Sequence, residues 1–151
     1  MAEPVHSNFS NSEKVFVKKL EESAILPTRS HPEDAGMDLY AFESGQIKPG
    51  GGIMARTGIA FSLPLGTVGM IADRSSMAKK GLKTAGGIID AGYRGEVQIV
   101  LRNLTSEPFQ FERGERIAQL LIIPILTPTV VEVRSLDGTT RGEQGFGSTG
   151  K

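Results

Sequence analysis

Asp90 is the residue of this sequence whose type and setting best fit acid–base chemistry. It follows two apolar residues and lies in a glycine-framed turn, in the stretch GGIIDAGYRG that spans residues 86–95. A carboxylate there can act as the general base that activates a water molecule, or it can accept the hydrogen bonds of the turn. Tyr93 can likewise stack on a sugar or fill a hairpin. Alone, the segment is more typical of a turn than of a catalytic site.

Arg74, Ser75 and Ser76 indicate a second kind of chemistry, the binding of anions. They come where a strand is expected to end and a short helix to begin, and an arginine with two hydroxyls at that point is typical of a phosphate cradle. The alternative is that Ser75 simply caps the helix. The glycine-rich C-terminal residues offer similar groups, since Arg141 adds a charge and Ser148 a hydroxyl. Their alternative is a disordered tail.

Two polar residues stand on otherwise apolar strand faces and therefore need partners. Asp38 lies among apolar residues at the start of a strand, and Arg74 is the candidate for its cationic partner. Gln119 shares a face with Ile117 and Leu121. Its partner is either structural or a ligand.

Short strands must position all of these residues. Apolar residues alternate with a period of two in most of the candidate strands, which are residues 14–20, 67–73, 95–103, 109–112, 117–125 and 130–134. In the second of them Val68, Met70 and Ala72 share one face, whereas residues 117–125 are apolar at nearly every position, as expected for a strand buried on both faces. One short helix is expected at residues 75–81. The pattern favours an all-β sandwich, barrel or jelly roll.

The composition removes several other classes of function. The 151 residues contain no cysteine and only two histidines, so thiol catalysis, Cys-ligated zinc and His-based sites are poorly supplied. The formal net charge is zero at pH 7, which argues against a protein that coats nucleic acid. The longest uncharged run, residues 117–131, contains two prolines and is too short for a membrane span.

We expect one domain between two less ordered ends. Residues 1–13 are interpreted as a disordered N-terminal tail, residues 14–136 as the β domain and residues 137–151 as a flexible Gly-rich arm. The arm has too few apolar residues to build a core of its own. No segment resembles a signal peptide, so we expect a cytoplasmic protein, or a nuclear or organellar one if the source is eukaryotic.

Five segments of the chain, in order, resemble the five motifs of the trimeric deoxyuridine triphosphatases (dUTPases). They are residues 35–41, 74–81, 86–97, 114–120 and 141–150. The resemblance implies a distorted, β-clip-like jelly roll with one short helix and a flexible C-terminal arm. It also implies a homotrimer with interfacial active sites, in which the first, second and fourth motifs come from one subunit, the third from another and the arm from a third.

The implied reaction is hydrolysis of dUTP to dUMP and pyrophosphate, which keeps uracil out of DNA and supplies dUMP for dTTP synthesis. By this resemblance Asp90 activates the attacking water, Tyr93 excludes a 2′-hydroxyl, and Asp38 organises the site. The other implied substrate-binding residues are Arg74, Ser75, Ser76 and Gln119 on the phosphates, Gly87 in the hairpin that pairs with uracil, Arg141 on the γ-phosphate, Phe146 stacked on uracil, and Gly147 and Ser148 in the arm. Mg²⁺ is the implied cofactor, held mainly by the triphosphate and water.

The chain departs from the family pattern at Asp73 and Ser76, where Pro and Gly are common, and at Glu115, which replaces Asp. Asp73 brings a negative charge next to the phosphate residues, so we expect it to point away or to pair with a lysine. Two rival functions stay open: a related dCTP deaminase with Glu96 as its reactive carboxylate, and a non-catalytic binding protein. The sequence around Asp90 argues against both.

Overall fold

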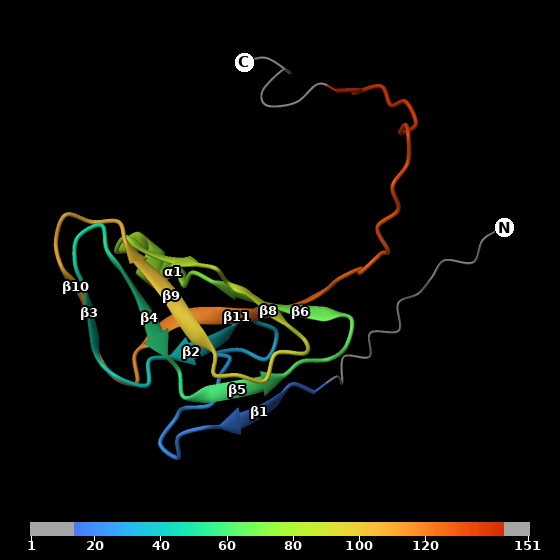
Figure 1. The fold of residues 1–151 in the computed structure, drawn as a ribbon. Coiled ribbons are helices and arrows are strands. Elements are labelled where there is room, and N and C mark those ends of the chain that lie inside the picture. Colours follow the sequence, from blue (N-terminus) through green and yellow to red (C-terminus); the bar gives the residue numbers. More distant parts are fainter. Residues whose placement is uncertain (1–13, 144–151) are drawn as a thin grey trace.

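The computed structural model describes residues 14–143 and is all-β with one short helix (Figure 1). The predicted tail, residues 1–13, lies outside the described residues, as do Phe146, Gly147 and Ser148 of the predicted arm. In chain order the elements are β1 (Phe16–Lys19), β2 (Met37–Tyr40), β3 (Gly45–Ile47), β4 (Gly52–Arg56), β5 (Ile59–Ser62), β6 (Thr67–Ala72), α1 (Ser75–Lys79), β7 (Leu82–Ala85), β8 (Ile88–Asp90), β9 (Gln98–Asn103), β10 (Phe109–Phe111) and β11 (Arg116–Pro124).

The strands form four antiparallel sheets, of which the two larger ones carry the candidate site. One has the strand order β2-β11-β6-β8 and the other β4-β9-β7, and the pairs β1-β5 and β10-β3 complete the body. Because β11 runs between β2 and β6, its register sets Gln119 opposite Asp38 on one side and Ala72 on the other. Residues from three distant parts of the sequence therefore meet at one place in the sheet.

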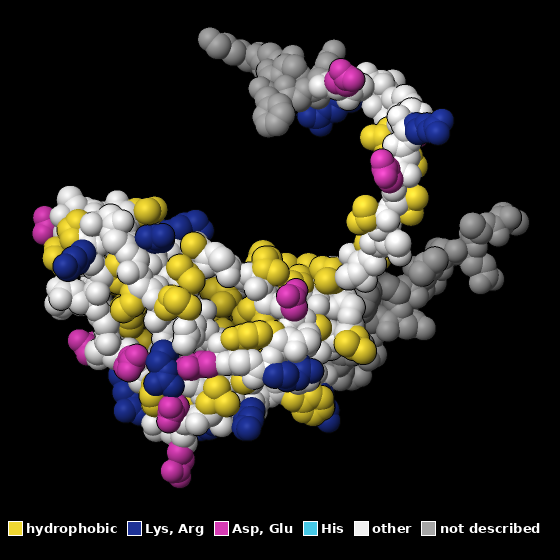
Figure 2. All heavy atoms as spheres, in the orientation of Figure 1, with side chains coloured by type: hydrophobic (Ala, Val, Ile, Leu, Met, Phe, Trp, Pro, Cys, Tyr) yellow, Lys and Arg dark blue, Asp and Glu magenta, His cyan; other side chains and the backbone are white. Residues whose placement is uncertain are grey.

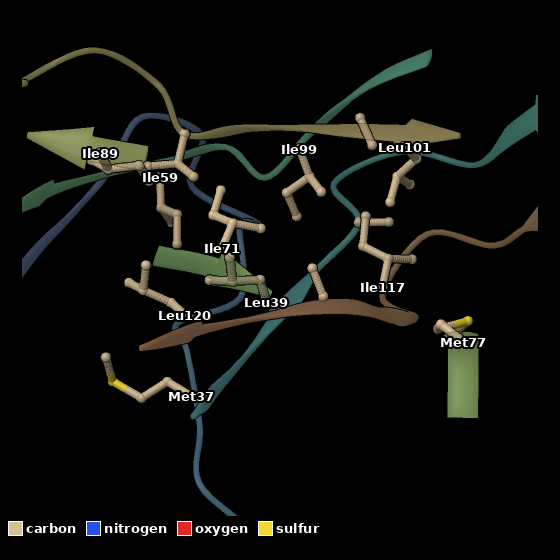
Figure 3. Packing of buried hydrophobic residues seen from close by; sticks show 14 of the residues in the cluster. Met37, Leu39, Ile59, Ile71, Met77, Ile89, Ile99, Leu101, Ile117 and Leu120 are labelled. Atoms are coloured by element: carbon tan, nitrogen blue, oxygen red, sulfur yellow. The ribbon is translucent and has the colours of Figure 1, made fainter. Parts of the chain in front are cut away.

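The hydrophobic core lies between the two larger sheets (Figure 3). Leu39 from β2, Ile117 and Leu120 from β11, and Ile99 and Leu101 from β9 are fully buried. A buried aliphatic side chain of this size stabilises the folded state by about 1.5–3 kcal/mol. The alternation along β9 follows the predicted period of two. This core fixes the strands from which the site residues project.

Helix α1 lies within the predicted residues 75–81, but Ser75 does not cap it. Arg74 stands at the N-cap position with φ −79° and ψ 137°, and no described side chain makes a capping hydrogen bond there. The capping alternative for Ser75 is therefore wrong. The helix ends before Gly81, whose φ of +83° favours glycine and whose missing Cβ leaves room for Thr105. Within residues 14–143 no helix is both long and apolar enough to span a membrane.

Strand β6 keeps the predicted period of two, with a different buried face. Val68, Met70 and Ala72 share one face as predicted, but they are only half-buried, and the alternate positions 67, 69 and 71 form the buried face. Gly69 has little room for a side chain there, because a Cβ would lie 3.0 Å from Leu63 Cδ1. The more apolar face of this strand is thus left partly open.

The strand predicted for residues 130–134 is wrong. Residues 126–143 leave the body without forming a strand, and among the described residues nothing pairs with 130–134 (Figure 1). Val130 is 95% exposed and Leu126 92%. β-Branched residues favour an extended conformation, but a strand also needs a neighbouring edge to bond its backbone N–H and C=O groups. The described part of this single chain does not supply that edge.

Candidate active site

One cleft gathers the residues predicted to bind phosphates. Its volume is about 470 Å³, and we call it the Arg74 cleft. Its lining residues are Ser30, Asp34, Ala35, Gly36, Asp38, Arg74, Ser75, Ser76 and Gln119. They come from the segment leading into β2, from the start of α1 and from β11. The structure therefore brings together the five predicted site residues of the first, second and fourth motif-like segments.

Asp38 is the partner of Arg74, as predicted, and it also binds a second arginine. Arg74 Nε donates to Asp38 Oδ1 at 2.7 Å, and Arg116 Nη1 donates to Asp38 Oδ2 at 3.2 Å. Arg74 Nη1 donates further to Ser76 Oγ and to the Arg116 carbonyl. Within residues 14–143 this leaves Nη2 of Arg74 without a hydrogen-bond acceptor. A guanidinium held on two sides with its free N–H groups at a cleft is suited to binding an anion.

Arg116 is a site residue that the sequence did not predict. The residue lies in the fourth motif-like segment, three positions before Gln119, and its register partner in β2 is Tyr40. The signal that pointed to it was Asp38. A carboxylate has two oxygens, and when it is as enclosed as Asp38, whose side chain is only 15% exposed, it can pair with more than one cation. Arg116 binds the second oxygen, so the two arginines together outweigh the single negative charge of Asp38.

Gln119 has a structural partner, the carbonyl of Asp73, to which its Nε2 donates at 2.7 Å. This bond ties β11 to the turn that precedes α1. Gly36 makes the arrangement possible, because a Cβ at that position would overlap Gln119 Oε1. An amide group has two hydrogens, and this bond uses one of those of Gln119. The Gln119 side chain also lines the Arg74 cleft.

Asp73 pairs with a lysine, one of its two predicted outcomes. Lys83 Nζ donates to Asp73 Oδ2 at 2.7 Å, and the backbone N–H and the hydroxyl of Thr84 donate to Oδ1 at 2.6 and 2.7 Å. Burial alone would raise the pKa of Asp73, but the hydrogen bonds from Lys83 and Thr84 outweigh it and hold the pKa below its ordinary value. The negative charge is directed to β7 and does not line the Arg74 cleft.

A second cleft, of about 440 Å³, contains Asp90, and we call it the Asp90 cleft. Its lining residues are Met54, Ile71, Gly86, Ile88, Ile89, Asp90, Tyr93, Glu96, Val97, Gln98 and Val100. Asp90 is the last residue of β8 and is exposed, and its carbonyl accepts the N–H of Tyr93 at 3.0 Å. The predicted turn is therefore present. Tyr93 is 48% exposed, and its Oη donates to the Glu96 carbonyl at 3.0 Å.

Gly87 keeps the backbone beside this cleft free of side chains. Its carbonyl accepts the N–H of Ile71 at 2.7 Å, and a Cβ on Gly87 would lie 2.5 Å from the Ile71 carbonyl oxygen. Its neighbour Gly86 has a φ of +58°, which favours glycine. Main-chain groups next to a cleft can recognise the edge of a flat ligand without interference from side chains.

The carboxylate of Glu96, the residue on which the deaminase alternative depends, is already engaged. Arg56 Nε lies 3.1 Å from both carboxylate oxygens, and the N–H of Gly58 donates to Oε1 at 2.8 Å. The hydrogen bonds with Glu21 and Glu96 raise the pKa of Arg56 above its ordinary value, so it stays charged. A carboxylate held by three donor contacts is a poor candidate for attack on a nucleobase.

The two clefts share no lining residue, so one chain does not bring all the predicted site residues together. Asp90 and Tyr93 lie in one cleft, and Arg74 with its neighbours lies in the other. Arg141 is exposed in a turn in which Gly142 N–H donates to the Thr139 carbonyl, on the segment that extends from the body. The predicted roles of Phe146, Gly147 and Ser148 concern residues outside the described part.

The described residues contain no group of three or more His, Asp or Glu side chains arranged to hold a metal ion. Asp38, the most enclosed carboxylate of the Arg74 cleft, is bound by two arginines. The donor groups of this cleft otherwise suit anions. A metal here would need most of its oxygen ligands from elsewhere.

The chain is similar to known proteins over most of its length. A family described as dUTPase matches residues 22–150. The deoxyuridine 5'-triphosphate nucleotidohydrolase of Clostridium novyi is 49% identical over 91% of this chain and 99% of its own length. The enzyme of the same name from Arabidopsis thaliana is 44% identical over 97% of this chain and 89% of its own length.

Solved structures give the same result. The dUTPase of Staphylococcus bacteriophage 80alpha with dUPNHPP has a TM-score of 0.87 and 32% identity, over 93% of this chain and all of that chain. The match confirms the predicted jelly-roll-like, all-β class, and the named relatives confirm the predicted activity. The chain therefore belongs to the dUTPase family and is a dUTP diphosphatase.

Proposed function

We propose that Asp90 takes a proton from a water molecule while the oxygen of that water attacks the α-phosphorus of dUTP. The bond from the α-phosphorus to the oxygen that bridges it to the β-phosphate breaks, and dUMP and pyrophosphate leave. The observation that carries this proposal is the exposed carboxylate of Asp90 at the edge of a cleft, on a backbone fixed by the Tyr93 turn. Among the described residues, Glu96 is the one other carboxylate that lines this cleft, and Arg56 already binds it.

The proposed roles of the other residues rest on family membership and, for Arg74, Ser75, Ser76, Gln119 and Tyr93, also on the clefts that these residues line. Arg74, Ser75 and Ser76 hold the phosphates, with Gln119 beside them, and Asp38 fixes the Arg74 guanidinium. Tyr93 lies under the deoxyribose, and the backbone around Gly87 pairs with uracil. The arm residues Arg141, Phe146, Gly147 and Ser148 close over the nucleotide. Support for the arm is the family match, which extends to residue 150.

Mg²⁺ fits this site as a partner of the substrate. When bound, it neutralises charge on the triphosphate, whose oxygens and water are its preferred hard ligands. This chain supplies arginine and hydroxyl groups around the same phosphates, consistent with the engaged state of Asp38. A mutant dUTPase from phage phi11 of S. aureus, 30% identical with a TM-score of 0.76, has been described with a structural Mg(II) ion.

The proposed assembly is a homotrimer whose sites combine the Asp90 cleft of one copy with the Arg74 cleft of another. Asp90 is the register partner of Val68 near the start of β6, whereas Arg74 follows the end of that strand. The six residue-to-residue steps from Val68 to Arg74 span about 20 Å when the chain is extended. That length exceeds what a triphosphate can bridge, because its phosphorus atoms are joined by single oxygens.

Exposed apolar residues on the segment that leaves the body also support assembly. Figure 2 shows hydrophobic side chains spread along it, and they include Leu126, Val130, Val131, Val133 and Leu136. Leu126, Val130 and Leu136 are each at least 85% exposed. Burial of such side chains against another copy would stabilise an oligomer by roughly 25 cal/mol per Å².

The role of Asp90 is tested by Asp90→Asn, with Glu43→Gln as a control because Glu43 is exposed and lines neither cleft. Pyrophosphate release from dUTP should fall by about 10²–10⁴-fold in the first variant, the usual contribution of a general base. Binding of a non-hydrolysable α,β-imido analogue, measured by calorimetry, should remain. Wild-type turnover in Asp90→Asn would refute the assignment.

A mixing experiment tests the shared site. Asp90→Asn and Arg74→Ala chains should each be almost inactive alone, but refolding an equal mixture creates sites that take an intact Arg74 from one copy and an intact Asp90 from another. Random assembly gives such sites about a quarter of the time, so activity should return to about a quarter of the wild-type value. Sites contained within one chain would give no recovery, and that result would refute the proposal.

A further inference from the structure

Arg56, at the end of β4, is the centre of a polar cluster next to the Asp90 cleft. Its Nε lies 3.1 Å from both Glu96 carboxylate oxygens, and its Nη2 donates to Glu21 Oε1 at 2.9 Å. The guanidinium also stacks on Phe42, with Cζ 5.1 Å from the ring centroid. The ion pairs with Glu96 and Glu21 and the stacking on Phe42 together hold Arg56 in one place, since a guanidinium can form hydrogen bonds in its plane and stack on its face.

Glu96 links this cluster to the cleft through both of its ends. Its carboxylate accepts from Arg56 and from the backbone N–H of Gly58, and the side chain is only 16% exposed. Its backbone carbonyl accepts the hydroxyl of Tyr93 at 3.0 Å. Because both groups belong to one residue, a shift of the Glu96 backbone changes its bonds to Arg56 and Gly58 and its bond to Tyr93 together.

The next residue strengthens the same attachment. Val97 N–H donates to the Ile59 carbonyl at 2.9 Å, and the Thr57 hydroxyl donates to the Val97 carbonyl at 2.5 Å. The segment 56–59 therefore holds Glu96 and Val97 through both side-chain and backbone bonds. A conservative substitution can remove the Arg56–Glu96 pair while the backbone bonds of this attachment remain.

Tyr93 depends on this attachment for its position. Tyr93 is 48% exposed, and its hydroxyl end lies close to Gly95, where a Cβ would overlap the Tyr93 hydroxyl. Within the described residues the only hydrogen bond of that hydroxyl is the one to the Glu96 carbonyl. A phenol with one hydrogen bond and a half-exposed ring tilts easily if its acceptor moves.

We propose that Arg56 is a positioning residue for sugar discrimination: through Glu96 it fixes the height of the Tyr93 ring, and with it the space left for a 2′-hydroxyl. The proposal rests on the role given above to Tyr93. Arg56 itself lines neither cleft. Its effect is therefore on the choice between dUTP and UTP rather than on the chemical step.

The test is kcat/KM for dUTP and for UTP, measured separately in Arg56→Gln, Arg56→Lys and Tyr93→Phe. The ratio of the two constants should fall by about tenfold in Arg56→Gln, mainly through a rise for UTP, as expected for loss of one charge-assisted contact. Arg56→Lys keeps the charge but loses the paired contacts with the Glu96 carboxylate, so its dUTP/UTP ratio should lie between those of the wild type and Arg56→Gln. Tyr93→Phe should lower the ratio similarly, and the double variant Arg56→Gln/Tyr93→Phe should lower it no further.

Arg113→Gln is the matched control. Arg113 stacks on the same Phe42 ring, 5.2 Å from its centroid, and bonds Ser23, but it makes no bond to Glu96. Its replacement should leave the dUTP/UTP ratio unchanged. An Arg56→Gln variant that alters both substrates equally, or an additive double variant, would overturn the inference. If Tyr93→Ala also leaves the ratio unchanged, the proposed role of Tyr93 fails as well, and the two failures are thereby distinguished.

Discussion

Replacing Asp73 should loosen the turn that carries Arg74, and the effect should depend on pH. The Asp73 carboxylate accepts bonds from Lys83 and from two groups of Thr84, while its carbonyl accepts from Gln119. One residue thus joins β7, β11 and the start of α1. Asp73→Ala removes the carboxylate and keeps the backbone, and Asp73→Asn keeps the shape and removes the charge.

The size of the effect follows from what is left without a partner. Thr84 is 8% exposed, so in Asp73→Ala its N–H and hydroxyl lose their acceptor in a largely buried place. An unsatisfied buried group costs about 1–3 kcal/mol, and two that relax in part suggest about 2–4 kcal/mol. The Lys83 side chain is 55% exposed and adds little. Asp73→Asn can still accept from Thr84, so about 1 kcal/mol is expected.

The pH dependence has a definite sign. The folded-state pKa of Asp73 lies below its ordinary value of 3.8, so its contribution to stability is complete above 3.8 and is lost as pH falls through the folded-state value. Because Asn does not titrate, the stability difference between wild type and Asp73→Asn isolates this group. It should be constant from neutral pH to about pH 5 and should shrink below about pH 4.

Thermal unfolding followed by circular dichroism measures this difference, with light scattering to confirm the same oligomeric state at each pH. At about 2–4 °C per kcal/mol, Asp73→Ala should lower Tm by roughly 4–16 °C at neutral pH. A stability difference between wild type and Asp73→Asn that persists unchanged to about pH 3 would refute the argument from the carboxylate. Equal Tm values for Asp73→Ala and wild type would refute the argument from Thr84.

Three further outcomes are expected. Asp38→Asn should lower kcat/KM for dUTP by about 10–100-fold, because Arg74 loses a charge-assisted bond, and an unchanged value would exclude a role for the pair. Gly87→Ala should weaken dUMP binding in calorimetry and lower Tm, because its Cβ would contact the Ile71 carbonyl oxygen at 2.5 Å; Gly92→Ala, where a Cβ meets no atom within 4 Å, is the control. Deletion of residues 140–151 should abolish turnover while size-exclusion light scattering still reports the oligomer. Dissociation would instead mean that the arm holds the oligomer together.

Strands with a clear apolar pattern could be predicted from the sequence, and short strands without one could not. Strand β9 alternates clearly and β11 is apolar at nearly every position. Even the three-residue β10 lies within the predicted residues 109–112, because Phe109 and Phe111 alternate with Gln110. Strands β3 (GQI) and β8 (IID) show no such alternation. They exist because longer neighbours supply their hydrogen bonds, as β6 does for β8. Such strands are a consequence of tertiary pairing.

The candidate site was predictable where a residue type conflicted with its surroundings. An aspartate and a glutamine on apolar strands required partners, and Asp38 and Gln119 have them. Asp73 was expected to point away from the phosphate residues or to pair with a lysine, and it pairs with Lys83. Arg116 was missed because an arginine at the exposed start of a strand conflicts with nothing. The division between two clefts was implied by the family resemblance alone, since spacing along a sequence does not report which face of a sheet a turn occupies.

The incorrect strand at residues 130–134 is itself informative under the proposed homotrimer. Its alternating β-branched residues are of the kind that pack on a sheet, yet Val130 and Val131 are 95% and 72% exposed. An isolated soluble chain gains nothing from such a pattern, because exposed apolar strands promote aggregation. The pattern is accounted for if the edge that completes the strand belongs to another copy. The segment then brings Arg141 and the arm to a neighbouring site, so that one stretch of sequence serves both assembly and catalysis.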